Sequence, residues 1–534
     1  MTAKKRRQRQ DSARPTPARP GRDHGQGQVP FWIPALLVSG FLLVSLLPRV
    51  QGSPNLTWSF WGAGAVLLGW LGVVAVRSST PLTRPPIVTV LRPQHYIQAL
   101  VQLAVFGYWG WYWRPVYDYA WLLVAQLLFA YAFSMVLAWS RRQTYVLGCG
   151  PFPIIFSTNL FLWFRDDWFY LQFLMIAVGF MGKEFVTWTR DGRRTHIFNP
   201  SAFSLGIFSL VLIATNTTDL TRGVDIATTL TLAPNIYLFL FLAGLVVMYF
   251  FSITLLAGSA AMVLFGASAL YALTTGVPYF VDSEIPSAVF LGLHLLVTDP
   301  STSPRTPLGR TVFGVLYGLG VFVLYWTLGA IGTPTFYDKL LCVPLLNLSV
   351  QQIDRIVARI SASVKRPPVG LWHIARGNAA HMAAWVLFFG AMTALGSTDG
   401  RHRGDTLPFW MELCEDGNAR ACERLVQIES NYCRDNSGWA CNELGGHYRD
   451  GRSVEHDPVR AYSLFAQGCE LRFQPACLNL LGPEEVIRSH PRVFDLRLLL
   501  REGGPNLLSM SDQTLSSRAC DHGWTFACRE GGGE

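Results

Sequence analysis

The chain has 534 residues, of which 50% are hydrophobic and only 15% are charged, and its formal net charge is +9. An ordinary soluble domain carries about 25% charged residues, so this composition excludes a wholly soluble protein. Many apolar runs of roughly 15–22 residues occur, close to the length that a helix needs to cross a bilayer. The sequence therefore predicts an all-α protein built around a polytopic membrane helix bundle.

Residues 1–28 form a tail rich in Lys, Arg, Pro and Gly. This composition predicts disorder, and positive charge beside a first span predicts a cytoplasmic position close to membrane lipid. The segment is too long and too basic before the first apolar run to be a cleavable signal peptide. Nucleic-acid binding is the alternative interpretation, but a basic tail beside a membrane span is usual, so we expect no nucleic-acid partner.

Thirteen apolar runs are predicted to span the membrane. They are Phe31–Leu47, Ser59–Val76, Tyr96–Trp113, Ala120–Trp139, Tyr145–Phe164, Trp168–Met181, Pro200–Thr215, Pro234–Phe251, Ile253–Leu273, Ile285–Val297, Thr311–Ile331, Phe336–Val350 and Asn378–Gly396. The weakest is Phe336–Val350, which is short and contains Pro344 and Asn347. This run could be a broken or re-entrant helix.

The positive charges orient these spans. With a cytoplasmic N-terminus, the segments that fall inside are rich in Arg and Lys, and they include 183–194, 305–310 and 351–377. This distribution follows the positive-inside rule, and omission of the weak span would place 351–377 outside, against the rule. Thirteen crossings put the C-terminus on the outer side. We therefore predict a multi-pass protein of the bacterial inner membrane with a periplasmic C-terminus.

The last part of the chain, residues 398–534, is predicted to form a separate periplasmic domain. It contains four cysteine pairs, each with seven residues between: Cys414/Cys422, Cys433/Cys441, Cys469/Cys477 and Cys520/Cys528. This spacing suits two helices that are joined by a short turn and bridged by a disulfide, which requires an oxidising compartment. Near-neighbour pairing is the simplest arrangement, although eight cysteines allow 105 pairings. Zinc spacing is absent, so no metal is expected, and Cys149 and Cys342 should stay reduced.

Between the second and third cysteine pairs, small and aromatic residues stand where they lock an αα-hairpin. These residues are Leu444, Gly445, Tyr448, Gly451, Asp457, Ala461, Phe465 and Gly468. The segment resembles the Sel-one-like repeat, a relative of the tetratricopeptide repeat, and the likeness weakens around Gly482–Ser517. The resemblance implies an α-solenoid whose groove binds another periplasmic protein. A small disulfide-stapled cap without a partner is the alternative.

A second resemblance covers Pro93–Arg355. FNPSAF at Phe198–Phe203 and TDPSTSPRTPLGR at Thr298–Arg310 lie on the same predicted side, and the loop Asn216–Ala233 lies on the other, with five spans before it and five after. These features resemble the RnfD/NqrB family, the membrane flavoprotein subunits of Rnf and of sodium-translocating NADH:quinone oxidoreductase. The resemblance implies a ten-helix core at 93–355. The remaining segments are then two extra spans at 29–92, a cytoplasmic segment with the last span at 356–397, and the repeats at 398–534.

The resemblance also implies FMN. In that family a threonine of an outer S-x-A-T loop carries FMN through a phosphoester, and here Ala227-Thr228 falls in the matching loop. Thr228 is therefore the candidate for covalent FMN, with Thr229 next. Non-covalent FMN and the absence of FMN are the alternatives, since threonine is common in loops.

A flavin holder on the cytoplasmic side is a further implication, with riboflavin or quinone as additional ligands. Its residues would be Lys183, Arg194, His196, Asn199, Asp299, Ser301, Thr302, Ser303 and Arg305. Asn199-Pro200 predicts a capped helix start, and Asp299-Pro300 predicts a second. Such starts present N–H groups that favour an anion. A well-capped helix beside an ordinary positively charged loop is the plainer interpretation.

Together these features predict a membrane electron-transfer protein, the redox subunit of an oxidoreductase-type complex. No nicotinamide-binding motif is present, so its electrons would come from redox partner proteins in the membrane. A flavin-free transporter, or a scaffold that presents the periplasmic repeats, is the alternative. His294 and His381 lie inside predicted spans and are functional candidates for that reason. A buried, hydrogen-bonded helix histidine is the plainer interpretation of both.

Overall fold

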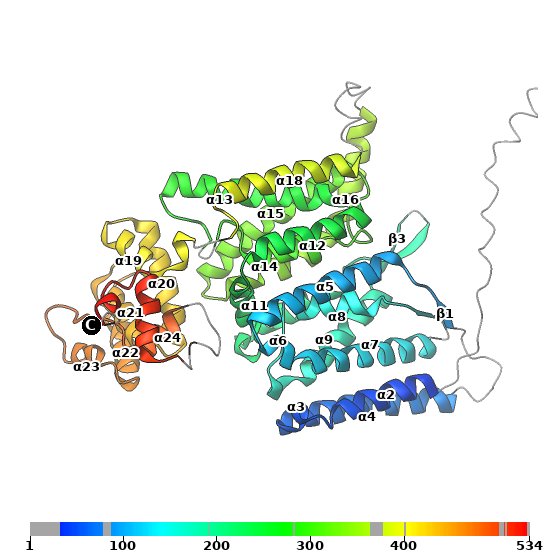
Figure 1. Cartoon of the computed structure of the whole chain (residues 1–534), viewed down its shortest axis with the longest axis horizontal. Coiled ribbons are helices and arrows are strands. Elements are labelled where there is room, and N and C mark those ends of the chain that lie inside the picture. The colour runs from blue at the N-terminus through cyan, green and yellow to red at the C-terminus, as the bar shows by residue number, and fades with distance from the viewer. Residues whose placement is uncertain are drawn as a thin grey trace, which may run out of the picture.

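The computed structural model describes residues 32–77, 87–141, 143–190, 192–280, 283–363, 377–399, 402–500, 507 and 510–530. The predicted basic tail at 1–28 lies outside the described residues, as does 364–376 of the predicted cytoplasmic segment. Within the described chain, helices dominate and the strands form two sheets of two strands each. The all-α prediction is therefore confirmed. Figure 1 shows a bundle of helices that run side by side, with a smaller helical domain at one end.

The bundle extends from Trp32 to Ala394. Its helices are α2 (Trp32–Val44), α3 (Pro48–Gln51), α4 (Pro54–Arg77), α5 (Pro93–Tyr112), α6 (Pro115–Asp118), α7 (Ala120–Ser140), α8 (Pro151–Asn159), α9 (Tyr170–Phe185), α10 (Pro200–Ala214), α11 (Gly223–Thr229), α12 (Ile236–Phe251), α13 (Thr254–Thr275), α14 (Ser287–Leu295), α15 (Pro307–Ala330), α16 (Asp338–Ser363) and α18 (Asn378–Ala394). Strand β1 (Ile87–Thr89) pairs in parallel with β2 (Tyr145–Leu147). Strands β3 (Thr187–Arg190) and β4 (Arg193–His196) form an antiparallel hairpin.

Two names are used below for the ends of the bundle. The domain end carries the tail domain (residues 402–530), and the hairpin end carries β3 and β4; they lie at the left and right of Figure 1. The segments that the sequence predicts to be cytoplasmic meet at the hairpin end, where Arg141 pairs with Glu184 at 3.0 Å. They therefore share one end of the bundle, as the charge pattern requires.

Helix length and composition identify a membrane protein. Five helical segments of the described chain could each cross a bilayer: Pro54–Arg77, Pro115–Ser140, Thr254–Thr275, Pro307–Ala330 and Thr335–Ile360. A sixth joins them if Gly223–Leu232 and Ile236–Phe251, bent by 102°, count as one span. Trp32–Val44 and Pro200–Ala214 are shorter apolar helices. The thirteen predicted crossings are thus not confirmed, because several predicted spans form helices that are too short by this measure.

The breaks in the bundle are not where the sequence suggests them. The weak run Phe336–Val350 begins in a single 3-10 turn, Thr335–Tyr337, and continues in α16, which runs unbroken past Pro344; Gly206 of α10 packs against the Pro344 ring. By contrast, the predicted spans 145–164 and 285–297 contain only the nine-residue helices α8 and α14. A nine-residue helix is about 14 Å long, roughly half of a bilayer core. The run Phe336–Val350 is therefore part of a helix long enough to span a membrane, as predicted, and the alternative of a broken helix is not realised.

The half-helices α8 and α14 lie deep inside the bundle. Every residue of α14 is buried, as are eight of the nine residues of α8. The two helices meet near their C-terminal ends, where Ser157 Oγ lies 3.4 Å from the Leu295 carbonyl oxygen. His294 of α14 is fully buried, and its Nδ1 lies 2.7 Å from the Phe290 carbonyl oxygen. This contact agrees with the plainer interpretation of His294 at one ring nitrogen, whereas the buried Nε2 has no hydrogen-bond partner among the described residues.

Small residues bring α13 and α15 into close contact. Gly314 and Gly318 form a GxxxG pattern on α15, and a methyl group at Gly314 would collide with the Leu256 carbonyl oxygen. At Gly318 the added carbon would lie 2.8 Å from the Ala260 carbonyl oxygen. In lipid, close approach of two helix backbones is a main source of helix association. Lipid tails are as apolar as the helix surface, so the hydrophobic effect does not drive the two helices together.

Gly314→Ala should therefore destabilise the bundle. We expect a loss of about 1–3 kcal/mol, the usual cost of overpacking a tight contact. The control is Gly266→Ala on α13, where an added methyl group meets nothing within 4 Å. Thermal unfolding of both variants in the same detergent measures the difference. Equal stability of the two variants would show that the α13–α15 contact does not limit stability.

The tail domain is a chain of short antiparallel helices. They are α19 (Leu407–Glu415), α20 (Ala419–Arg434), α21 (Gly438–Asp450), α22 (Pro458–Glu470), α23 (Gln474–Asn479), α24 (Val493–Leu499), α26 (Asp512–Asp521) and α27 (Ala527–Glu530). The four predicted disulfides are all present: Cys414–Cys422, Cys433–Cys441, Cys469–Cys477 and Cys520–Cys528. Each bridges consecutive helices across a short turn, as the spacing predicts. Cys149 and Cys342 are free.

Small and aromatic residues hold the helices of the tail domain together. An added methyl group at Gly445 would lie 2.7 Å from the ring of Phe465, and Gly451 adopts a positive φ of 65° at the end of α21. Asp457 caps α22 by accepting a hydrogen bond of 2.9 Å from the Arg460 N–H. The αα-hairpin pattern that the sequence shows at these positions is thus present in the fold.

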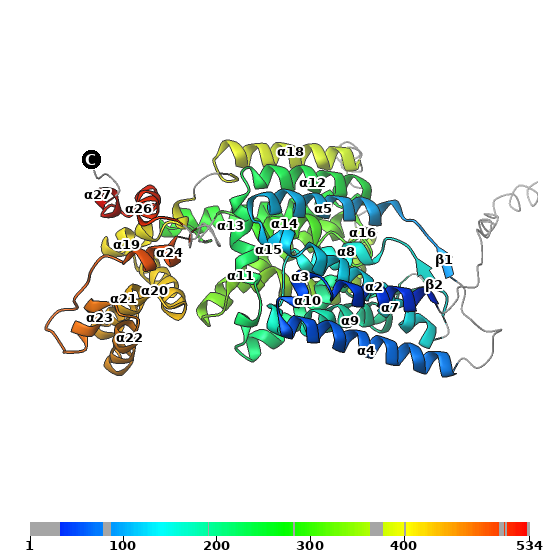
Figure 2. The same ribbon diagram turned by 60° about the horizontal axis from the view of Figure 1, so that its bottom comes forward.

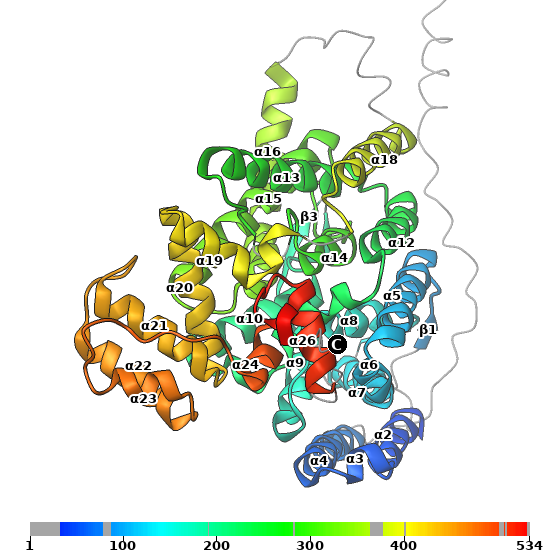
Figure 3. The same cartoon turned by 60° about the vertical axis from the view of Figure 1, so that its left-hand side comes forward.

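The tail domain is fastened to the bundle by polar side chains. Arg424 donates to the Tyr279 carbonyl oxygen at 2.9 Å, and Asn418 donates to the Thr275 carbonyl oxygen at 3.1 Å. Val277, from the loop after α13, belongs to the hydrophobic core of the tail domain. Figure 2 shows the tail domain at one end of the bundle, and in Figure 3 α24 and α26 lie in front of that end.

Candidate functional site

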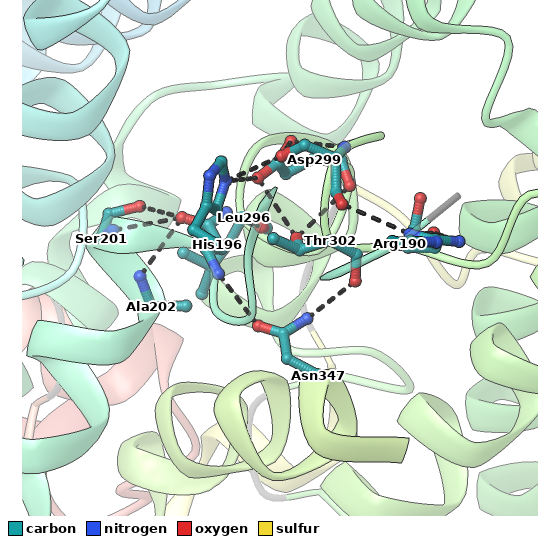
Figure 4. Close-up of polar contacts among 11 residues, drawn as sticks. Arg190, His196, Ser201, Ala202, Leu296, Asp299, Thr302 and Asn347 are labelled. Carbon is teal, nitrogen blue, oxygen red and sulfur yellow. Dashed lines mark hydrogen bonds and ion pairs between the residues drawn. The ribbon is translucent and has the colours of Figure 1, made fainter. Parts of the chain in front are cut away.

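The hairpin end holds a polar cluster around His196. His196 is the last residue of β4, and its partner on β3 is Thr187. The hairpin carries His196 toward the segment that follows α14, where His196 Nε2 lies 2.9 Å from Ser301 Oγ and 3.7 Å from Asp299 Oδ2 (Figure 4). Strand pairing therefore brings together residues that are more than 100 positions apart.

Asp299 is the centre of this cluster. Its Oδ1 accepts hydrogen bonds from the Ser301 N–H at 2.9 Å and from Ser301 Oγ at 2.6 Å, and its Oδ2 lies 3.2 Å from Thr302 Oγ1. Asp299 caps a turn, and the next helix, α15, begins at Pro307 behind Thr306. The predicted helix start at Asp299-Pro300 was therefore wrong.

Ser301, His196 and Asp299 do not form a hydrolase triad. In a triad the carboxylate orients the ring nitrogen opposite the one that faces the serine. Here Asp299 and Ser301 both approach the same nitrogen, His196 Nε2, and Asp299 also accepts the Ser301 hydroxyl. The arrangement orders a loop and leaves no activated nucleophile.

Asn199 caps α10 as predicted. Its Oδ1 accepts hydrogen bonds from the Ser201 N–H at 3.1 Å and the Ala202 N–H at 3.5 Å, and its Nδ2 donates to the Leu296 carbonyl oxygen at 2.9 Å. Asn347 of α16 then joins both segments, because its Oδ1 accepts from the Asn199 N–H and its Nδ2 donates to the Thr302 carbonyl oxygen. The amide of Asn199 is thus engaged within the protein.

Arg190 makes the shortest ion pair among the described residues of this end, and the sequence did not single it out as a site residue. Its guanidinium is 7% exposed and pairs with Asp354 of α16 at 2.6 Å. The same group donates to the Ser303 carbonyl oxygen at 3.2 and 3.1 Å. Arg190 therefore ties the hairpin, the loop after α14 and α16 together.

The other residues of the predicted cytoplasmic flavin holder make fewer contacts with the cluster around His196. Arg194 lies on the exposed hairpin, where it donates to Thr187 Oγ1 at 2.6 Å. Arg305 reaches the cluster through its backbone N–H, 3.2 Å from Asp354 Oδ1. Lys183, near the end of α9, makes no hydrogen bond or ion pair with other described residues. The structure thus brings His196, Asn199, Asp299, Ser301, Thr302 and Ser303 together and leaves Arg194 outside the group.

Stability should depend on the ionisation of Asp299. Burial opposes its charge, but the hydrogen bond and charge of His196 and the bonds from Ser301 outweigh this and lower the pKa of Asp299 from 3.8 to about 2. A lowered pKa in the folded state stabilises the fold above the unfolded value, and the contribution is lost as pH falls from about 4 to 2. We expect Asp299→Asn to cost about 2 kcal/mol near pH 5.

The measurement is the unfolding free energy of both proteins between pH 2.5 and 8. The difference should be largest near pH 5 and shrink below about pH 4. A difference that grows as the pH falls below about 4 would contradict the assigned cause. Asp512→Asn is the control, because its side chain is 72% exposed.

The domain end contains the second candidate site. Thr228 and Thr229 lie on the short helix α11, in the loop that the sequence singles out. Thr229 is 3% exposed, and its hydroxyl donates to the Asp225 carbonyl oxygen at 2.6 Å. Thr228 is partly exposed, and its Oγ1 contacts the Val224 and Asp225 carbonyl oxygens at 3.0 and 3.3 Å. Thr228 lines the outer cavity described next, and Thr229 is not among the residues of its wall.

This outer cavity has a volume of about 290 Å³, near the lower end of the range for small-molecule sites. Three parts of the chain enclose it: the bundle, the linker after α18 and the tail domain. Its lining consists of Thr228, Thr231, Leu232, Tyr237, Ser283, Glu284, Gly396, Ser397, Thr398, His402, Asp405, Thr406, Leu407, Leu499, Leu500, Arg518, His522 and Trp524. The wall therefore includes residues with hydroxyl, imidazole, indole and guanidinium groups and two carboxylates.

The linker is held against the bundle by two acids. Asp399 accepts from the Tyr237 N–H at 3.2 Å and from the Leu238 N–H at 3.4 Å. His402 Nε2 lies 3.4 Å from Glu284 Oε1. Burial alone would raise the pKa of Glu284, but the hydrogen bond and charge of His402 lower it. The negative charge of Glu284 is thus matched by His402 at the wall of the cavity.

Sequence reasoning identified Thr228 but missed the rest of this site. His402, Arg518, His522 and Trp524 stand 174 or more positions after Thr228 in a segment whose repeat pattern suggests only a scaffold. Only the packing of the tail domain onto the bundle places them here. No protein-family model, curated protein or solved structure matches this chain.

Proposed function

We propose that this protein is a membrane electron-transfer protein that carries FMN in the outer cavity, in an Rnf- or Nqr-like chain. The observation that carries the proposal is the position of Thr228. The one threonine that the RnfD/NqrB resemblance selects is also the residue of its pair that lines a ligand-sized cavity. The cavity beside Thr228 supports the proposal, because a threonine on an open surface would have no space beside it for a bound flavin.

The residues that line the outer cavity suit FMN. A phosphoester at Thr228 needs an accessible hydroxyl, and its phosphate needs nearby donors, for which Arg518 and His522 of the cavity lining are the candidates. A flavin ring needs an apolar face, and Trp524, Leu499 and Leu500 supply one. When bound, FMN would supply electron transfer. The protein's own part is to hold the phosphate, to orient the ring and to limit access of water.

The location of the protein is part of the proposal. We place the bundle in a bacterial inner membrane with the hairpin end in the cytoplasm and the tail domain in the periplasm. The four disulfides of the tail domain support this, because such bonds form and persist in an oxidising compartment. Redox partners in the membrane would supply and receive electrons, and the repeats would bind a further periplasmic protein. The hairpin-end cluster stays a candidate site for riboflavin or quinone.

The test is the visible absorption spectrum of the purified protein. Made alongside a competent flavin transferase, the protein should be yellow and should show flavin bands that bleach on reduction with dithionite. Extraction with acid then separates covalent from non-covalent flavin, since only the latter is released. A colourless protein with intact disulfides would refute the proposal.

A transporter is the second candidate, and the half-helices α8 and α14 favour it. Two antiparallel nine-residue helices that end inside a bundle are a common element of solute and ion pathways, where their free ends face the transported species. This function requires no flavin. The colourless result described above would favour it, and uptake by proteoliposomes would then identify the solute class.

A further inference from the structure

We infer that α21 and α23 of the tail domain form a peptide-binding surface, which residues 483–489 of the same chain occupy as an internal ligand. The partner that fits this surface is an extended segment of a periplasmic protein, with an aliphatic residue two positions before an arginine. The inference rests on the part of the proposed function that gives the repeats a protein partner, and it does not depend on flavin. Residues 483–489 are called the strap below.

The first observation is the burial of α21 on all sides. Every residue from Gly438 to His447 is buried, although a helix at the surface of a small domain normally leaves a polar face in water. Helices α20 and α22 pack against two sides of α21. The strap covers a further side, where α21 presents Asn442 and Glu443. Burial of a polar face is costly unless its groups are hydrogen-bonded, so the strap has to supply partners.

The second observation is that this polar face binds the backbone of the strap. Asn479 of α23 accepts the Ile487 N–H at 2.7 Å and donates to the Ile487 carbonyl oxygen at 2.9 Å. Asn442 donates to the same carbonyl oxygen at 3.1 Å, and Trp439 Nε1 donates to the Ser489 carbonyl oxygen at 3.0 Å. The two amides also hold each other, since Asn479 Nδ2 donates to Asn442 Oδ1 at 2.8 Å. Every peptide carries these backbone groups, so another extended chain can make the same contacts.

The third observation identifies the side chains that the surface selects. A methyl carbon added at Gly446 of α21 would lie 3.2 Å from Val486 Cγ1 and 3.2 Å from Arg488 Nη2. Residues two positions apart on an extended chain share one side, so both side chains of the strap face the helix. Arg488 also pairs with the buried carboxylate of Glu443. An aliphatic residue and an arginine in this spacing therefore complete the surface.

The fourth observation is that the strap can leave without disrupting the core of the tail domain. Residues 483–489, all within the described chain, lie outside its helices and strands, and none of them belongs to the described hydrophobic core. Glu484, Glu485, Arg488 and Ser489 are exposed. A segment of this kind opens locally at little cost. Because α23 and α24 hold its two ends, the strap competes with a free peptide at an effective concentration on the order of millimolar.

The experiment measures binding of a fluorescent peptide with the sequence of residues 482–490 to the full-length protein in detergent, by anisotropy. In the unaltered protein the tethered strap should exclude the peptide at micromolar concentrations. The variant Ile487→Pro, Arg488→Gln removes the N–H and the guanidinium that hold the strap, and it leaves every residue of α21 and α23 in place. Half-saturation of this strap variant should need at least roughly tenfold less peptide than half-saturation of the unaltered protein.

Three controls identify the groups that bind the peptide. Asn479→Ala, added to the strap variant, removes two backbone hydrogen bonds and should weaken binding by roughly tenfold or more. Gln474→Ala, added in the same way, changes an exposed amide of α23 and should leave binding unchanged. A peptide with glutamine in place of its arginine should bind the strap variant roughly tenfold more weakly, because it has no charge to pair with Glu443.

A second measurement uses the unaltered protein, so that it does not depend on the folding of a variant. Hydrogen exchange followed by mass spectrometry reports on the backbone N–H groups of residues 483–489. Millimolar peptide should raise the exchange rate of these groups, because it displaces the strap from the surface. The peptide with glutamine should not raise the exchange rate at the same concentration.

Three results would overturn the inference. The first is a strap variant that forms its four disulfides and unfolds cooperatively but does not bind the peptide. The second is unchanged exchange of the strap at millimolar peptide. The third is equally tight binding to the unaltered protein, which would show that the strap does not occupy the surface. The flavin spectrum is independent of all three: a yellow protein without peptide binding refutes this inference alone, and a colourless protein that binds the peptide refutes the flavin proposal alone.

Discussion

Replacement of Thr228 by alanine should abolish covalent flavin. The phosphoester needs the side-chain oxygen of residue 228, and alanine has none, so in-gel fluorescence under denaturing conditions should fall from a clear band to background. Thr228→Ser keeps a hydroxyl and should keep part of the signal. The fold should be unaffected, because the Thr228 hydroxyl bonds only to carbonyl oxygens of its own helix.

Thr229→Ala is the matched control for this experiment. Thr229 neighbours Thr228, but it is buried and its hydroxyl bonds to the Asp225 carbonyl oxygen. Its removal should cost about 1 kcal/mol of stability and leave the fluorescent band in place. Fluorescence that is lost in Thr229→Ala and kept in Thr228→Ala would move the attachment site to the second threonine.

Arg190→Met should be the most destabilising single substitution at the hairpin end. It leaves the Asp354 carboxylate and the Ser303 carbonyl oxygen without their main partner. Removing one member of a buried ion pair costs about 3–5 kcal/mol. The Asp354 side chain is 24% exposed, so water still reaches its charge. We therefore expect a loss of stability near the lower end of this range. The measurement is the free energy of unfolding in detergent.

Two further variants test the cause. Arg194→Met changes an exposed arginine on the same hairpin and should shift stability by no more than about 0.5 kcal/mol. The double variant Arg190→Met, Asp354→Leu should recover part of the loss, because no charge is left uncompensated. Additive effects of the two substitutions would show that the pair does not act as a unit.

Local signals in the sequence predicted local features well. The Asn199-Pro200 dipeptide predicts a capped helix start, and Asn199 caps α10 through its own side chain. The seven-residue cysteine spacing predicts four bridged helix pairs, and all four are formed. In both cases the interacting residues are close in sequence, so a short motif holds all of the necessary information.

Features that depend on distant partners were predicted less well. A run of apolar residues in 285–297 has the composition of a span, and only the packing around α14 reveals that the helix ends at Leu295. In α16, Pro344 suggests a break, yet the helix runs unbroken from Asp338 to Ser363, with Gly206 of α10 packed against the Pro344 ring. Hydropathy reports the composition of one segment. It holds no information about the neighbouring helices that help to decide where that segment begins, ends or breaks.

The candidate sites show the same division. Thr228 stands out in the sequence because its neighbours form a motif, whereas Arg190 and Asp354 are 164 positions apart and meet only after folding. Arg518 and Trp524 belong to a repeat domain, whose pattern encodes helix packing and carries no sign of a ligand. Their place in the wall of the outer cavity follows from the position of that domain on the bundle.

The most direct test of the account is the mass of the peptide that contains Thr228. The protein is made alongside a competent flavin transferase and digested, and the peptide spanning Gly223–Leu232 is analysed by mass spectrometry with fragmentation. We predict that this peptide gains the mass of FMN minus water and that fragmentation places the gain on Thr228. An unmodified peptide, together with no flavin released by acid from the intact protein, would contradict the account.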